Sequence, residues 1–128
     1  MGIRRQARQC SLQLLFQYDF TRDEPGEILY RFWKMQEQEL PVGVVRGAEF
    51  FFRQTLAHRQ EVDQWIRKHT HNWPIDRLSV VDRNILRLAI TEFLIGEEPE
   101  TAVIINEALE MARSFSGERS VRFINGIL

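Results

Sequence analysis

The chain has 128 residues, the length of one ordinary domain, and 44% of them are hydrophobic, enough to build a buried core. Its 17 basic and 18 acidic side chains give a net charge of −1, which argues against disorder and against a generally cationic nucleic-acid-binding protein. The single cysteine, Cys10, excludes an intrachain disulfide framework. We find neither a signal peptide nor an apolar run long enough to cross a bilayer, and we expect a cytoplasmic protein without membrane contact.

The periodicity of apolar residues is helical, and no segment alternates as a strand does. In the first segment, apolar residues recur every three or four positions, the spacing of one buried stripe on a helix. They are Ile3, Ala7, Cys10, Leu14 and Tyr18. Pro25, which follows an acidic residue, predicts the start of a second helix. Residues 42–69 form a periodic stretch longer than an average helix, so we expect a break near residues 58–61.

The next helix is predicted over residues 80–95. Ser79 and Asp82 have the spacing of a variant capping box at its start, and Gly96 suits its end. Because apolar side chains occupy two faces of this helix, we predict that it is the central, most buried one.

Two more helices complete the chain. One covers residues 102–115 and stops at Gly117, and Ser120 is expected to cap a last helix that runs to the chain end. This last helix has no C-terminal stop signal, so we expect the native chain to continue. The sequence therefore predicts an all-α protein, folded as a single compact domain over residues 1–128.

No catalytic or metal-binding motif is present. Gly43 and Gly47 are not followed by the lysine and hydroxyl residue of a phosphate-binding loop. Cys10 lies on the apolar stripe, where a buried hydrophobe is expected rather than a nucleophile. No histidine has ligand partners at metal-site spacing. We expect no enzyme activity, no cofactor and no metal.

The charge is spread unevenly along the chain. Residues 1–18 carry a net charge of +3 and residues 111–128 carry +2, so residues 19–110 carry −6. Six glutamates and no basic residue lie between Arg87 and Arg113. These are Glu92, Glu97, Glu98, Glu100, Glu107 and Glu110. The basic ends suit a polyanion and the acidic stretch suits a basic protein, with chance unevenness on surface helices as the alternative.

The first helix gives the basic N-terminal end a candidate binding face. At about 100° per residue, one side of this helix lies opposite its apolar stripe. That side carries Arg5, Arg8, Leu12 and Phe16, and we expect the two apolar side chains to be partly exposed. Arginines bind phosphate and an exposed ring stacks on a base, as single-stranded nucleic acid requires. The equal alternative is that another helix covers Leu12 and Phe16.

Two blocks of sequence stand out, and the spacing of the second is distinctive, whereas short basic helices like the first are common. The first comprises RRQARQC at 4–10 and LLF at 14–16. The second comprises VDRNILRLAI at 81–90, INEA at 105–108, ARSFS at 112–116 and FINGIL at 123–128. Both resemble the NusB family of transcription antitermination factors. The resemblance implies about seven helices that bind single-stranded boxA RNA of ribosomal RNA leaders. It also implies a heterodimer with the small ribosomal protein NusE, within the antitermination complex of RNA polymerase.

The resemblance also implies site residues. The family's RNA-contacting arginines fall on Arg4, Arg5 and Arg8, its helix-one aromatic on Phe16, and its base-contacting C-terminal aromatic on Phe123. We add the basic C-terminal residues Arg119 and Arg122, although the family often has an acidic or small residue at the position of Arg119. For the protein partner we predict Asp82, Glu92 and Glu107. Asp82 has the alternative role of a helix cap, and Glu107, with Asn106, that of satisfying buried backbone groups.

Two rival functions remain open at this point. The first is that the chain is the NusB-like RNA-binding domain of an rRNA cytosine methyltransferase, which a long extension with a methyl-donor-binding domain would indicate. The second is a protein-binding helical scaffold, such as a homodimer whose interface hides the arginine-rich helix. Such a scaffold would form a dimer in solution and would not bind RNA at any salt concentration.

Overall fold

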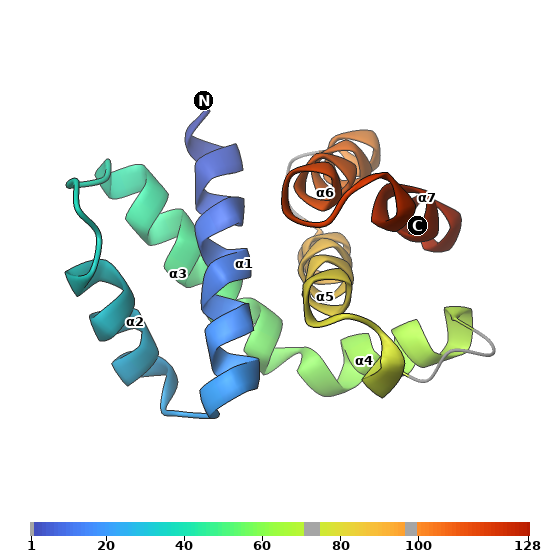
Figure 1. Ribbon diagram of the computed structural model, residues 1–128, viewed down its shortest axis with the longest axis horizontal. Coiled ribbons are helices and arrows are strands. Elements are labelled where there is room, and N and C mark those ends of the chain that lie inside the picture. The colour runs from blue at the N-terminus through green and yellow to red at the C-terminus, as the bar shows by residue number, and fades with distance from the viewer. Residues whose placement is uncertain (1, 71–74, 97–99) are drawn as a thin grey trace. The chain divides into compact units, whose positions relative to one another are not determined.

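The computed structural model describes residues 2–70, 75–96 and 100–128 (Figure 1). Within these ranges it contains seven α-helices, one short 3-10 helix and no strand, so the all-α prediction is confirmed. The elements are α1 (Ile3–Thr21), α2 (Pro25–Lys34), α3 (Val42–Ala57), α4 (Arg59–His69), η1 (Ile75–Arg77), α5 (Val80–Ile95), α6 (Thr101–Phe115) and α7 (Glu118–Ile127). None of the described helices is long and apolar enough to span a membrane.

The chain groups into two compact units, Met1–Gln54 and Thr55–Leu128. The first contains α1, α2 and most of α3, and the second contains the end of α3 and everything that follows it. That all 128 residues fold as one domain stays a prediction.

Most helix boundaries follow from local sequence signals. Pro25 occupies the first position of α2, as predicted. The long stretch 42–69 breaks at His58, between α3 and α4. At the start of α5, the Ser79 hydroxyl oxygen accepts a hydrogen bond from the backbone N–H of Asp82 at 3.0 Å. Gly96 ends this helix in the left-handed conformation, at φ 69°.

One predicted cap is wrong. Ser120 does not cap the last helix but lies inside it, because α7 already begins at Glu118 with Gly117 as its N-cap residue. Gly117 has φ 135°, a backbone conformation that side-chain-bearing residues rarely adopt. The chain thus turns at the glycine itself, and the helix follows without a side-chain cap.

In the first unit, α1 packs against both α2 and α3. Ala7, Cys10 and Leu14 are buried, which confirms the middle of the predicted apolar stripe, but Ile3 at its start is 54% exposed and Tyr18 at its end is only half-buried. A Cβ atom placed on Gly47 of α3 would lie 3.0 Å from the Cβ of Ala7, so the absence of a side chain at residue 47 allows α1 and α3 to approach closely. This close approach fixes where the arginine-rich end of α1 lies within its unit.

In the second unit, α5 is the central helix, because it contacts α4, α6 and α7. Every residue from 84 to 92 is buried, including Leu88 at 0% exposure, and the predicted central role of this helix is confirmed. Figure 1 shows α6 and α7 following it as the last two helices of the chain. The N-terminal end of α5, which is less buried, takes part in the site described below.

Candidate nucleic-acid interface

The start of α1 presents part of the predicted basic surface. Arg4 and Arg5 are exposed, and Phe16, three helical turns further on, is 46% exposed. The predicted exposure of Phe16 is therefore confirmed. Guanidinium groups and an accessible ring on one helix can bind phosphates and a base of a single strand.

Arg8 and Leu12 do not lie on an exposed face, and for both of them this expectation is wrong. Arg8 is 2% exposed and Leu12 is 3% exposed. The guanidinium carbon of Arg8 lies 5.5 Å from the centroid of the Phe51 ring of α3, the geometry of a cation–π contact. The reason is that packing covers α1 on a second side as well, where Arg8, Leu12 and Leu15 form a second buried stripe.

The second unit has a surface pocket of about 350 Å³ between the start of α5 and the first turns of α7. Three of its lining residues were predicted as site residues, namely Asp82, Arg119 and Phe123. The structure thus brings a predicted partner-binding carboxylate together with two predicted RNA-binding side chains. Arg119 is exposed and Phe123 is half-buried. Arg122 is exposed on α7 but does not line the pocket.

The same pocket contains residues that the sequence analysis did not select. Arg77, at the end of η1, adds a second cation, and Leu78, Ser79 and Ser120 complete the lining. The basic charge of Arg77 was visible in the sequence. Its closeness to α7 was not, because residues 77–82 and 119–123 are far apart along the chain and meet only through the packing of α5 on α7.

The predicted acidic partner surface is only partly present. Glu92 and Glu107 are 6% and 8% exposed, so the expectation that they form an accessible acidic patch is wrong. Both lie on the inner faces of α5 and α6, where helix packing covers them, and both make interactions there. The burial of Glu107 agrees with its alternative role, in which the side chain satisfies buried backbone groups. Of the three predicted partner residues, Asp82 alone is partly exposed. Glu97 and Glu98 lie outside the described residues.

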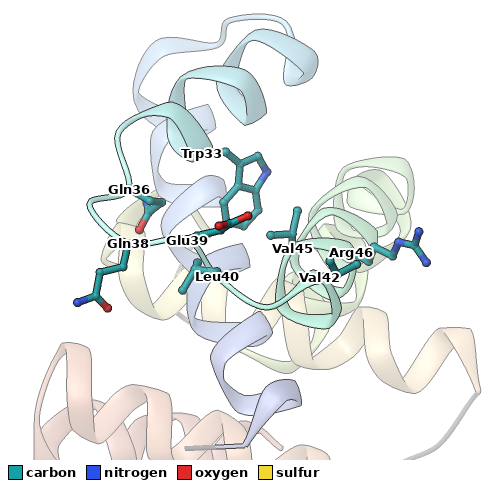
Figure 2. A pocket seen from close by; sticks show the side chains of 8 residues that line it. All are labelled: Trp33, Gln36, Gln38, Glu39, Leu40, Val42, Val45 and Arg46. Carbon is teal, nitrogen blue, oxygen red and sulfur yellow. The ribbon is translucent and has the colours of Figure 1, made fainter.

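A second hollow, of about 520 Å³, lies in the first unit between the end of α2 and the start of α3 (Figure 2). Figure 2 shows the Trp33 ring facing Val45 across it, with Arg46 directed away from the tryptophan. The Trp33 Nε1–H group donates to a Glu49 carboxylate oxygen at 3.2 Å, so the ring is held in place. The lining is mostly apolar and amide, and its one cation, Arg46, is directed away from the Trp33 ring, whereas the α5–α7 pocket is lined by two cations and an aromatic ring.

Cys10 is not placed for chemistry. It is buried on the core side of α1, and burial raises the pKa of its thiol because desolvation disfavours the thiolate. Among the residues that the structure describes, no three His, Cys, Asp or Glu side chains gather as metal ligands.

Comparison with known proteins gives one consistent result. The model of the NusB family matches residues 5–128. The chain is 43% identical to the transcription antitermination protein NusB of Solibacter usitatus, over 100% of this chain and 87% of that protein. It is 38% identical to NusB of Myxococcus xanthus, over 100% of this chain and 93% of that protein. A crystal structure of antitermination factors NusB and NusE with double-stranded RNA matches 99% of this chain and 93% of its own, with TM-score 0.87 and 25% identity.

Proposed function

We propose, because this chain belongs to the NusB family, that it is a non-catalytic transcription antitermination factor of the cytoplasm. It binds single-stranded boxA-type RNA of ribosomal RNA leaders together with NusE, within the antitermination complex of RNA polymerase. The proposal rests on relatives that match this chain over its whole length and are named as antitermination proteins. This chain in turn covers 86–93% of the length of each of these relatives. That observation favours the antitermination factor over the methyltransferase domain.

The surface chemistry supports RNA as the ligand. In the first unit, the exposed guanidinium groups of Arg4 and Arg5 can bind phosphates, and the exposed ring of Phe16 can stack on a base. In the second unit, Arg119, Arg122 and Phe123 offer the same combination on α7. Arg8 contributes differently, because its guanidinium is buried and packs on Phe51, so that it helps to hold the arginine-rich end of α1 in place.

For the protein partner, Asp82 is the predicted contact that the burial pattern leaves accessible. A basic ribosomal protein would be attracted to a carboxylate on the surface, and such charges chiefly set encounter rate and orientation. Glu92 and Glu107 would act on this partner only through the position of α5 and α6, since both side chains are buried.

The test is a salt series of RNA-binding titrations. A fluorescent single-stranded boxA RNA is titrated with the full chain, alone and with NusE, and anisotropy is recorded at several salt concentrations. We expect log K to fall with log salt by about 0.7 for each phosphate neutralised. We expect NusE to tighten RNA binding, and RNA to tighten NusE binding by the same factor.

Two variants separate charge from stacking. Phe123→Ala should weaken RNA binding by about 1 to 3 kcal/mol with little change in the salt slope, because it removes a stacking surface and no charge. Arg122→Ala should flatten the slope by somewhat less than one unit. Arg67→Ala, which removes an exposed cation of α4, is the control and should change neither quantity. An RNA that does not bind at low salt, with or without NusE, refutes the proposal and favours the scaffold.

A further inference from the structure

The α5–α7 pocket combines chemistry that a simple phosphate-binding surface does not need. Two exposed cations, Arg77 and Arg119, line it together with the Phe123 ring. A carboxylate, that of Asp82, lies among them and would repel a phosphate. A ligand that satisfies all these groups must be anionic in one part and must donate hydrogen bonds from another, flat part.

The Asp82 carboxylate is prepared for such a donor. Its Oδ1 atom is shielded from solvent and has no hydrogen-bond partner within the described part of the chain. The capping interaction of this residue uses only its backbone N–H, which donates to Ser79. A carboxylate oxygen without a donor is unfavourable. Because the second torsion of an aspartate side chain is broad, the carboxylate can turn toward a ligand that supplies N–H groups.

From this arrangement we infer that the pocket selects an unpaired nucleobase that bears an amino group, guanine best of all, and disfavours uracil. The inference rests on the proposed RNA-binding function and adds a base preference to it. The base stacks on Phe123, Arg119 and Arg77 bind its phosphate, and the Asp82 carboxylate accepts hydrogen bonds from its Watson–Crick edge.

The preference follows from the donors and acceptors at the base edges. An ionised carboxylate only accepts hydrogen bonds. Guanine presents two adjacent N–H donors, one on its ring and one on its amino group, which match the two oxygens of a carboxylate. Adenine and cytosine each present one amino donor beside an acceptor. Uracil presents a single N–H between two carbonyl oxygens, and these oxygens would face the negative charge of Asp82. The volume, about 350 Å³, leaves room for one base with its ribose.

The test uses mononucleotides, so that the pocket is probed apart from the rest of the RNA surface. The full-length chain, labelled with ¹⁵N, is titrated with guanosine or uridine 5′-monophosphate, and the shifts of the Ser79 and Ser120 amide signals are followed. We expect guanosine monophosphate to bind about tenfold more tightly, the size of a good two-bond base contact. Arg119→Ala should weaken both nucleotides alike, and Arg67→Ala, outside the pocket, should change neither.

The decisive variant is Asp82→Asn, which keeps the shape of the side chain and the capping N–H but replaces one acceptor by a donor. It should abolish the preference for guanosine while the protein stays folded, with melting lowered only slightly because a carboxylate in the first turn of α5 is lost. Equal binding of the two nucleotides by the wild type, no binding of either, or a preference unchanged in Asp82→Asn overturns the inference. The inference is also overturned if the Asp82→Asn variant no longer binds NusE but still prefers guanosine monophosphate, because Asp82 then belongs to the surface that binds the protein partner. Binding of boxA RNA by the wild type in the same buffer tests the proposed function separately.

Discussion

Arg87 of α5 and Asp63 of α4 form a two-pronged ion pair inside the second unit. The Nε–H and Nη2–H groups of the arginine donate to the two carboxylate oxygens at 2.8 and 3.0 Å, and Nη1 donates to the Asn84 side-chain oxygen at 3.2 Å. Both side chains are almost fully buried. Because each charge is neutralised and hydrogen-bonded in a fixed geometry, this pair sets how α4 lies against the central helix.

Removing one partner of this pair should destabilise the protein strongly. Arg87→Met leaves the Asp63 carboxylate buried without its cation, and we expect a loss of about 3 to 5 kcal/mol in the free energy of unfolding, measured by urea denaturation. The double variant Arg87→Met/Asp63→Leu should recover much of that loss, because it buries no unpaired charge. A double variant as unstable as the single one would contradict this account.

Leu88→Ala tests the central position of α5. Leu88 is 0% exposed, and truncation leaves a cavity that neighbouring helices can fill only in part. We expect a loss of about 2 to 5 kcal/mol, measured by chemical denaturation. Leu94→Ala on the same helix is the control, since Leu94 is 43% exposed and should cost far less. A loss below about 1 kcal/mol at Leu88 would be incompatible with its burial.

Glycine substitutions should separate close helix packing from helix propensity. Gly47→Ala places a methyl group 3.0 Å from the Cβ of Ala7, which cannot rotate away, so α1 and α3 must move apart. We expect a loss of about 1 to 3 kcal/mol. Gly26→Ala, in α2 with no atom within 4 Å of its new Cβ, should stabilise the protein by up to about 1 kcal/mol. Thermal melting measures both, and a stabilising Gly47→Ala would show that the two helices separate at no cost.

The buried thiol gives a test that depends on pH. Burial raises the pKa of Cys10, so the folded state holds the thiol proton more tightly than the unfolded state does. The contribution of this group to stability is therefore complete below the pKa of the unfolded chain, and it is lost as pH rises toward the higher pKa of the folded state. We expect Cys10 to react slowly with a disulfide reagent at pH 8 and rapidly once urea is added. Equal rates with and without urea would contradict the burial.

Arg5 and Arg8 should affect RNA binding in different ways. Arg5→Ala removes an exposed charge and should weaken RNA binding and flatten the salt slope by up to about 0.7. Arg8→Ala removes a buried side chain that packs on Phe51 and should lower the melting temperature as well. Arg53→Ala, which removes an exposed cation of α3, is the control for the loss of one positive charge. If Arg8→Ala leaves melting unchanged, its burial does not contribute to stability.

The sequence alone determined the helices, because their signals are local. Pro25, the Ser79 cap and Gly96 act within a few residues of where they stand, and each marks the helix end that the structure has. The apolar periodicity of residues 80–95 likewise identified the central helix, since a helix buried on two faces needs apolar side chains on both. The two family blocks, within residues 4–16 and 81–128, pointed to RNA because their residue types and spacing can be recognised along the chain without the fold.

What only the tertiary structure decided is which side chains neighbouring helices cover. Helical angles placed Arg8, Leu12 and Phe16 on one side of α1, but packing buries Arg8 and Leu12 and leaves Phe16 exposed. The acidic stretch looked like a surface, yet Glu92 and Glu107 face the interior. The pocket of Asp82, Arg119 and Phe123 could not be read from the sequence either. Its parts are contributed by two segments distant in the chain, and burial and proximity between such segments depend on how helices pack rather than on their local periodicity.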